Sequence, residues 1–222
     1  KEVKMSEKKT IAVAGGTGNL GGALALRLAK AGYKVVIGSR SAESAQKAAA
    51  EIGHGAEGKQ NADAAAAADL IIVSVPFAAQ EATLRDIAPH AAGKIVVETT
   101  VPLVPPKVMR VQLPSEGSAA QRAQTILGDQ VTLVSAFHNV AAHKLAQDID
   151  VGCDVLVFGD DKAARAEVVK LAEAVGLRGV HAGALANSAA AEALTSILIF
   201  INKNYAVDGA GIRITGDLKE PS

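Results

Sequence analysis

The sequence predicts an α/β fold, built on a doubly wound, mainly parallel β-sheet with a small helical annex at its C-terminal end. Apolar, β-branched runs alternate with alanine-rich segments of helical period along most of the chain. Strands that are buried on both faces of a parallel sheet have this continuous apolar character. With 222 residues, the chain has room for one such domain and an addition, but not for two full domains.

Six segments have the composition of strands, at residues 10–14, 34–37, 70–75, 94–97, 131–134 and 155–158. Helices are expected between them. The first helix should run from about Asn19 to Ala31 and end at Gly32, because glycine often terminates a helix. Asn61 and Asp63 are expected to cap a short helix over residues 64–68 with their side chains.

Two regions interrupt this alternation. Residues 99–118 contain four of the seven prolines, which predicts a long irregular loop of the kind that often carries function. Residues 187–204 have the pattern of one long, mostly apolar helix, followed by a glycine-rich tail. We therefore expect a main domain over residues 6–183 and an annex over residues 184–222, which closes over the sheet edge or over a second protomer.

Composition excludes several classes of protein. The formal net charge is zero and aromatic residues make up 3% of the chain, so neither the basic surface nor the stacking platforms of a nucleic-acid-binding protein are expected. Cys153 is the only cysteine, which excludes an intramolecular disulfide and predicts a buried structural thiol. The apolar run at residues 197–201 is much shorter than the roughly 18 residues of a membrane span. We expect a cytoplasmic protein without metal, membrane or nucleic acid.

A glycine-rich loop follows the first predicted strand and precedes the first predicted helix. Its residues Gly16, Thr17, Gly18, Asn19, Leu20 and Gly21 match the pattern G-x-G-x-x-G. In this motif the first glycine makes a tight turn, the second lets the backbone approach a pyrophosphate, and the third permits close packing of helix on sheet. The helix N-terminus offers free N–H groups to the phosphates. This context predicts a Rossmann-type domain that binds a dinucleotide.

The end of the second strand indicates which dinucleotide is bound. NAD-binding sites place an acidic residue about 20 residues after the loop, where it accepts from the ribose 2′-hydroxyl. This chain has Ser39 and Arg40 there and no acid before Glu43. An arginine donates bidentate hydrogen bonds to a 2′-phosphate, and the hydroxyls of Ser39 and Thr17 add donors. The sequence favours NADP over NAD; a solvated surface arginine is the alternative for Arg40.

The loop also fits the atypical short-chain dehydrogenases, which move a proton with a Tyr-x-x-x-Lys pair. The two tyrosines, Tyr33 and Tyr205, are followed four residues later by Ile37 and Gly209. The sequence therefore lacks the Tyr-x-x-x-Lys pair, and proton transfer by that pair is excluded.

Seven short motifs follow one another along the chain: Gly15 to Gly21, Gly38-Ser39-Arg40, Ser74-Val75-Pro76-Phe77, Gly117-Ser118-Ala119-Ala120, Ser135-Ala136-Phe137-His138-Asn139-Val140, Glu192-Ala193-Leu194-Thr195 and Gly211-Ile212-Arg213-Ile214-Thr215. By their order and spacing, the chain from Lys9 to Thr215 resembles the NADPH-dependent reductases of coenzyme F-420 (F420), an 8-hydroxy-5-deazaflavin. The resemblance implies reversible hydride transfer between NADPH and the deazaflavin, which lie face to face in one cleft. Because both reactants are cofactors, such a protein supplies orientation and electrostatics.

The resemblance also implies where the cofactors bind. Val75, Pro76 and Phe77 are expected to run past the adenine-ribose and pyrophosphate, and Val101 and Pro102 to flank the nicotinamide. On the acceptor side the resemblance places Ala136, His138, Asn139, Asn187 and Thr195.

His138 is the one titratable side chain expected near the transferred hydride, where it would donate to the deazaflavin carbonyl region or stabilise developing charge. A histidine that caps a strand end with a satisfied hydrogen bond is the alternative. Thr195 faces the deazaflavin or packs the late helix, and Asn187 with Ser188 caps that helix or contacts the ring.

One departure leaves the acceptor open. Relatives tend to carry an Arg or Gln shortly before Glu192, where this chain has Ala189, Ala190 and Ala191. An NADPH-dependent reductase of another acceptor, such as a flavin, a quinone or a small carbonyl compound, is thus an alternative, as is an NADP-sensing module without turnover. The apolar late helix also predicts a homodimer.

Overall fold

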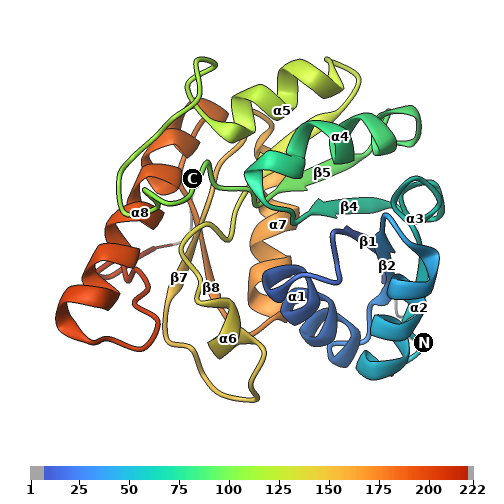
Figure 1. Cartoon of the computed structure of the whole chain (residues 1–222), viewed down its shortest axis with the longest axis horizontal. Helices are drawn as coiled ribbons and strands as arrows, with labels where there is room; N and C mark the ends of the chain where they lie inside the picture. Colours follow the sequence, from blue (N-terminus) through green and yellow to red (C-terminus); the bar gives the residue numbers. More distant parts are fainter. Residues whose placement is uncertain (1–7, 220–222) are drawn as a thin grey trace.

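A computed structural model describes residues 8–219, so residues 6 and 7 of the expected main domain lie outside the described residues. The main sheet has six parallel strands in the order β3-β2-β1-β4-β5-β6 (Figure 1). The strands are β1 (Thr10–Ala14), β2 (Lys34–Ser39), β3 (Glu57–Gln60), β4 (Leu70–Val73), β5 (Ile95–Glu98) and β6 (Thr132–Ser135). The predicted doubly wound parallel sheet is confirmed.

Helices cover both faces of this sheet. They are α1 (Asn19–Lys30), α2 (Ala42–Ile52), α3 (Asn61–Ala67), α4 (Phe77–Ile87), α5 (Ala119–Leu127), α6 (Ala142–Leu145) and α7 (Lys162–Ala174), with a 3₁₀ turn at Ala88–His90. Side chains of β1 alternate between two cores: Ile11 and Val13 pack with α1, α2, α6 and α7, whereas Ala12 and Ala14 pack with α3, α4 and α5. This alternation is the two-residue period of a strand that is buried on both faces.

A small second sheet continues the fold beyond β6. Strands β7 (Asp154–Val157) and β8 (Arg178–His181) pair in parallel, with α7 between them in sequence. An antiparallel bridge between Ser135 and Phe158 joins this pair to the end of β6. The sequence prediction missed β3 and β8, because neither Glu57–Gln60 nor Arg178–His181 has an apolar run.

The chain ends with a 3₁₀ turn (Leu185–Asn187), helix α8 (Ser188–Tyr205) and a tail. Asp154 anchors the tail, because its carboxylate accepts from the guanidinium of Arg178 and from the N–H of Ile214. The expected annex thus follows the second sheet, although the domain boundary at residues 183–184 stays a prediction. Cys153 is buried with a free thiol, as expected.

Two expected helix caps are wrong. The short helix is α3 and begins at Asn61 itself, and no side chain caps it. Asn61 instead accepts a hydrogen bond from the N–H of Gly15, at 3.3 Å. For α8, the capping alternative predicted for Asn187 and Ser188 is likewise wrong: Asn187 donates to the carbonyl of Ala182, and the buried hydroxyl of Ser188 has no hydrogen-bonding partner within residues 8–219.

Candidate functional site

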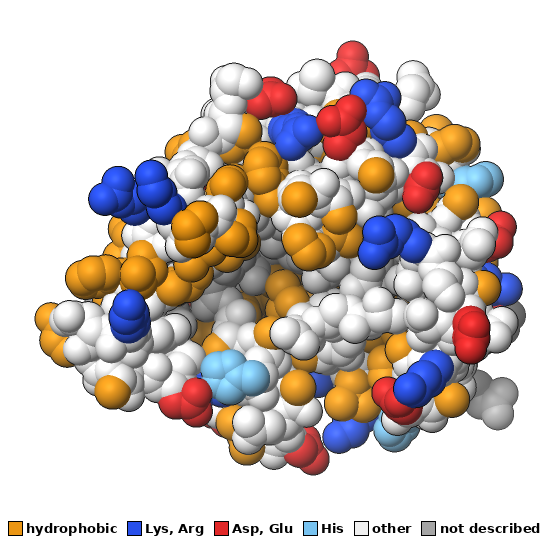
Figure 2. All heavy atoms as spheres, viewed as in Figure 1, with side chains coloured by type: hydrophobic (Ala, Val, Ile, Leu, Met, Phe, Trp, Pro, Cys, Tyr) orange, Lys and Arg blue, Asp and Glu red, His pale blue; other side chains and the backbone are white. Residues whose placement is uncertain are grey.

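Apart from Asn187 and Thr195, the predicted site residues lie at or just after the carboxyl ends of the parallel strands. The loops that follow β1, β2, β4, β5 and β6 all leave the sheet at this edge, where ligands bind in open α/β folds. Figure 2 shows the molecular surface hollowed near the centre of this view, with hydrophobic side chains around the hollow.

The glycine-rich loop has the geometry of a phosphate cradle. Gly16 lies in a tight turn, where its N–H donates to the carbonyl of Val13 at 3.0 Å, and the preceding Gly15 takes the left-handed conformation, with φ of +77°. A Cβ at Gly16 would lie 2.8 Å from the carbonyl oxygen of Val13, and one at Gly21 would lie 2.7 Å from that of Gly15. Both distances are far below van der Waals contact, so these glycines allow the loop, strand and helix to pack closely.

The start of α1 is open toward a ligand. Its N-cap residue, Gly18, makes no side-chain capping bond, and a Cβ there would meet only the Gly15 oxygen, at 3.3 Å. Thr17, Gly18 and Asn19 are exposed. The first N–H groups of α1 are therefore available for a pyrophosphate, as the motif predicts.

Asn61 supports this loop from the neighbouring connection. Its side chain is buried, it holds the N–H of Gly15, and its oxygen lies 2.8 Å from where a Cβ would stand at Gly38. Sequence reasoning missed this role, because a polar residue at a helix start looks like an ordinary cap.

Ser39 and Arg40 lie where β2 ends, and Arg40 is exposed. The hydroxyl of the next residue, Ser41, caps α2 by accepting from the N–H of Ser44. A guanidinium at this corner is free to reach a 2′-phosphate.

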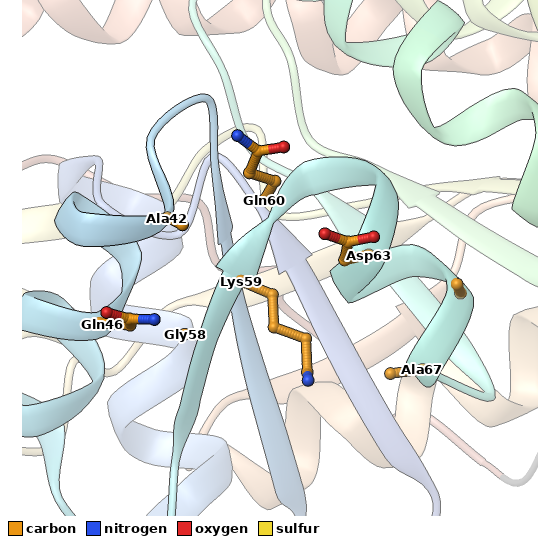
Figure 3. Close-up of a pocket in the computed structure, with 8 residues that line it drawn as sticks. Ala42, Gln46, Gly58, Lys59, Gln60, Asp63 and Ala67 are labelled. Atoms are coloured by element: carbon orange, nitrogen blue, oxygen red, sulfur yellow. The ribbon is translucent and has the colours of Figure 1, made fainter.

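A cavity of about 580 Å³ opens beside this corner, between α2 and α3 along the edge strand β3 (Figure 3). Gln46, Lys59 and Asp63 are polar residues in its wall. The Lys59 side chain extends away from Gln60 and toward the side of Ala67 (Figure 3). Its ammonium group lies 3.7 Å from the carboxylate of Glu57, which pairs with Val36 and not with the end of β2.

The connections after β4 and β5 lie side by side. Hydroxyl groups tie them together, since Thr99 donates to the carbonyl of Val73 at 2.9 Å and Thr100 to that of Val75 at 3.4 Å. Val75 and Val101 are half-buried, Pro76 is exposed and Pro102 is buried. The structure thus brings the two predicted walls of the NADP side together.

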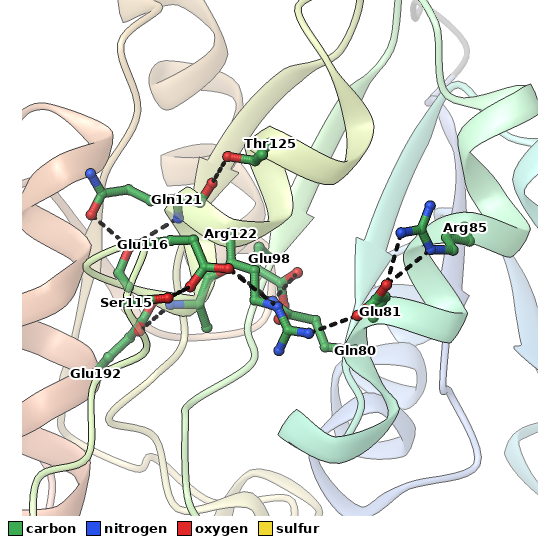
Figure 4. A network of polar contacts seen from close by, with 12 residues as sticks. Gln80, Glu81, Arg85, Glu98, Ser115, Glu116, Gln121, Arg122, Thr125 and Glu192 are labelled. Carbon is green, nitrogen blue, oxygen red and sulfur yellow. Dashed lines mark hydrogen bonds and ion pairs between the residues drawn. The ribbon is translucent and has the colours of Figure 1, made fainter.

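Phe77 begins α4 directly after Pro76, and the guanidinium of Arg122 lies over its ring, 5.1 Å from the centroid. Arg122 in turn forms an ion pair with Glu81 (Figure 4). One face of the Phe77 ring is therefore covered by the protein.

His138 is held in a buried turn after β6. Phe137 has φ of +66°, a conformation that is rare for a bulky side chain, and the turn places the His138 ring against Ser135. The Ser135 hydroxyl and His138 Nε2 are 2.7 Å apart. Burial lowers the pKa of His138 to about 3, so the imidazole is neutral at physiological pH.

Helix α8 reaches the same turn. Thr195 donates to the carbonyl of His138 at 2.8 Å, and Asn139 donates to the carbonyl of Ala191 at 3.0 Å and to the Thr195 hydroxyl at 3.2 Å. His138, Asn139 and Thr195 also line a cavity of about 170 Å³. The structure thus brings together three predicted acceptor-side residues, whereas Asn187 is exposed at the far end of the 3₁₀ turn.

Sequence reasoning missed a series of buried polar side chains that lies between the predicted NADP-side residues and the predicted acceptor-side residues. Glu98, Gln80 and Glu192 are each at most 1% exposed, and they lie between β5, α4, α5 and α8 (Figure 4). Burial raises the pKa of Glu98 and of Glu192 to about 7 in each case. The Glu98 signal was present in the sequence, as an acid directly after an apolar strand.

No group of three or more His, Cys, Asp or Glu side chains within residues 8–219 is arranged to hold a metal ion. By length and composition alone, the segment Leu185–Tyr205 would suffice to cross a membrane, although core helices of soluble proteins pass the same test.

Comparisons with known proteins agree with this geometry. The family described as NADP oxidoreductase, coenzyme F420-dependent, matches residues 10–102. A curated F420-dependent NADP reductase of Methanothermobacter thermautotrophicus is 42% identical, over 92% of this chain and 94% of its own length. One from Methanocaldococcus jannaschii is 40% identical, over 92% of this chain and 97% of its own.

Among solved structures, a protein of Arthrobacter sp. FB24 superposes with a TM-score of 0.80 at 24% identity, over 94% of this chain and 100% of that one. A reductive aminase of Aspergillus terreus in complex with NADPH4, cyclohexanone and allyl amine gives a TM-score of 0.64 at 23% identity, over 90% of this chain and 62% of its own. These structures share the fold, and the curated relatives share nearly the full length. The chain belongs to the family of F420-dependent NADP reductases.

Proposed function

We propose that this protein transfers a hydride reversibly between NADPH and coenzyme F420. The main support is that relatives named F420-dependent NADP reductases align over 92% of the chain at 40–42% identity. That alignment spans both the glycine-rich loop and the turn at His138.

The NADP side of the proposal assigns roles to specific atoms. The open N–H groups at the start of α1 would hold the pyrophosphate, and Arg40 with Ser39 and Thr17 would hold the 2′-phosphate. Val75 and Pro76 would line the path between them, with the exposed face of Phe77. Val101 and Pro102 would flank the nicotinamide and keep water from it.

The acceptor side would be formed by Ala136, His138, Asn139 and Thr195. When both cofactors are bound, NADPH supplies the hydride and the deazaflavin receives it. With its depressed pKa, His138 would act as a neutral imidazole that orients the ring or donates to its carbonyl region, and not as a cation. Asn187 would contribute only if the acceptor extends past the start of α8.

A reductase of another acceptor is the second candidate. With Ala189, Ala190 and Ala191 after the buried Ser188, the first turn of α8 exposes no polar side chain, so this turn offers little to recognise an acidic deazaflavin tail. A flavin, a quinone or a small carbonyl compound would not need that recognition.

One assay separates these functions. The protein is mixed with NADPH and oxidised F420, and in parallel with flavin mononucleotide, a quinone and a small aldehyde, while absorbance is followed. Bleaching of the deazaflavin band with NADPH oxidation is the expected result. Oxidation of NADPH only with another acceptor would favour the second candidate, and tight NADPH binding without turnover would indicate a sensing module.

We also propose a cytoplasmic homodimer. The outer face of α8 exposes Ile197, Phe200 and Tyr205, with exposed fractions of 45%, 52% and 71%. Val111 and Met109 of the preceding long loop are exposed as well, and this loop contacts α8, since the buried Ser196 hydroxyl donates to the carbonyl of Arg110. An apolar face of this kind is typical of a surface that a second protomer covers.

A further inference from the structure

The inner face of α8 is polar or small, whereas its outer face is apolar. Its buried residues are Ser188, Ala191, Glu192 and Ser196. Such side chains offer little apolar area, so the hydrophobic effect alone fixes the position of α8 weakly. Directional hydrogen bonds therefore help to determine how α8 sits on the sheet domain, beside the half-buried Leu194, Leu198 and Ile199.

Glu192 provides one of these contacts. Its carboxylate accepts from the N–H of Ala119 at 2.7 Å and from the N–H of Ala120 at 3.0 Å. These are the first two N–H groups of α5, where the helix dipole favours a negative charge. A side chain of α8 thus accepts the hydrogen bonds of two N–H groups that have no partner within α5.

Gln80 extends the contact to the NADP side. Its amide donates to the carbonyl of Ala119 at 2.9 Å and to the carboxylate of Glu98 at 3.3 Å. The other oxygen of Glu98 accepts from the N–H of Thr100 at 2.8 Å. A continuous chain therefore runs from α8 through α5 and α4 to the connection after β5 (Figure 4).

The two ends of this chain stand beside the two cofactor positions. Thr100 immediately precedes Val101 and Pro102, the proposed nicotinamide wall. Glu192 precedes Thr195 by three residues, so both lie on one face of α8, and Thr195 holds the turn that carries His138. The buried chain joins the donor wall to the acceptor wall.

Resting on the proposed function, we propose that Glu192, Gln80 and Glu98 are positioning residues that set the spacing between the NADPH and deazaflavin walls of the cleft. They touch neither cofactor. Hydride transfer requires a short, well-aligned approach, and a misplacement of about 1 Å costs on the order of 100-fold in rate. These three residues would therefore mainly increase the rate of hydride transfer and would change NADPH affinity little.

Two variants each remove different hydrogen bonds from the series that connects Glu192, Gln80 and Glu98. In Glu192→Gln, an amide replaces the carboxylate and accepts from only one of the two α5 N–H groups, while its NH₂ faces the other. In Gln80→Met, a side chain of similar length loses both donors. Glu173→Gln is the matched control, because Glu173 is exposed on α7.

The first measurement is hydrogen exchange of the protein without cofactors. We expect faster exchange in both variants at residues 99–102 and in the first turns of α8, and no change in the control. Faster exchange confined to the start of α5 would identify Glu192 as a local helix cap and overturn the proposal.

The second measurement is single-turnover hydride transfer from NADPH to F420, with NADPH dissociation constants from fluorescence titration. We expect transfer about 10-fold to 100-fold slower in both variants, NADPH affinity within about threefold of the wild type, and a deuterium isotope effect that depends more steeply on temperature. Folded variants with lower melting temperatures but unchanged transfer rates would assign the chain a structural role only. A wild type inactive with F420 would refute the proposed function, while the exchange experiment would still decide whether the two walls are coupled.

Discussion

At the scale of single residues, environment sets charge state more than residue type does. His138 is kept neutral by burial, whereas Glu98 and Glu192 are partly protonated near neutral pH for the same reason. Desolvation disfavours the charged form in both cases, so it lowers the pKa of a base and raises that of an acid. Arg40 is exposed at the end of β2, where its planar guanidinium can offer paired hydrogen-bond donors to a phosphate.

Arg40→Ala should weaken NADPH binding by about 10-fold to 100-fold, because charge-assisted hydrogen bonds contribute about 1.5–3 kcal/mol. NADH lacks the 2′-phosphate and should lose little affinity. Fluorescence titration with both nucleotides tests this difference. An equal loss for NADPH and NADH would show that the 2′-phosphate binds elsewhere.

His138→Ala should lower turnover with F420 more than it lowers NADPH affinity, because the ring lies on the proposed acceptor side. Steady-state kinetics and NADPH titration measure the two effects separately. An unchanged turnover would remove His138 from the mechanism.

Glu98 should make stability fall as pH rises. Its folded-state pKa of about 7 lies above its ordinary value of 4.5, so between these values the folded state binds more protons than the unfolded state. Raising the pH through this window therefore favours unfolding. His138 acts in the opposite sense, since its depressed pKa makes stability fall as pH drops through 6.5 toward 3.

Glu98→Gln removes the Glu98 contribution. The melting temperature of the variant minus that of the wild type should increase by about 5 to 10 °C when the pH is raised from 5 to 8. Thermal unfolding at both pH values tests this, with Glu173→Gln as the control. A constant difference between variant and wild type would place the Glu98 carboxyl in a more solvated state than the structure shows.

At the scale of elements, close approach of backbone to backbone determines where glycine is required. The contact between α1 and the glycine-rich loop needs Gly21, because a Cβ there would stand 2.7 Å from the Gly15 oxygen and 3.1 Å from the Gly16 Cα. The next glycine, Gly22, would place its Cβ 3.4 Å from the Gly16 oxygen, a distance that slight relaxation accommodates.

Gly21→Ala should therefore push α1 away from the loop, weaken NADPH binding and lower the melting temperature. Gly22→Ala, one position later in the same helix, should retain most of the NADPH affinity and most of the melting temperature of the wild type. Titration and thermal unfolding of the pair provide the comparison. Equal behaviour of the two variants would mean that α1 moves freely against β1.

At the scale of the whole molecule, α8 combines a polar inner face with an apolar outer face. The inner face is held by Glu192 and Thr195, and the outer face, with Ile197 and Phe200, has no cover among residues 8–219. A second copy of the chain is the cover that we propose.

Phe200→Glu should convert the homodimer into a monomer, because a charge at the centre of an apolar contact remains unpaired when buried. Light scattering after size exclusion measures the mass. Ile149→Glu is the control, since Ile149 is also exposed, at 44%, but lies on the loop after α6. A monomeric wild type would contradict the homodimer.

The sequence by itself predicted the doubly wound sheet, the glycine-rich loop and the Arg40 corner. These features depend on local signals: apolar runs, glycine spacing, and a basic residue at the end of a strand. It also identified the motifs at Glu192 and at Gly117 to Ala120 as separate signals.

Only the tertiary structure joined those two motifs, because Glu192 and Ala119 are 73 residues apart and meet through the packing of α8 on α5. Strands β3 and β8 stayed hidden for a related reason: their polar residues pair through the backbone, which the sequence pattern does not report. Asn61 also gained its partner, Gly15, from a distant turn. Local chemistry determines which elements form and which ligand the loop can hold, whereas long-range packing decides which buried polar groups find each other.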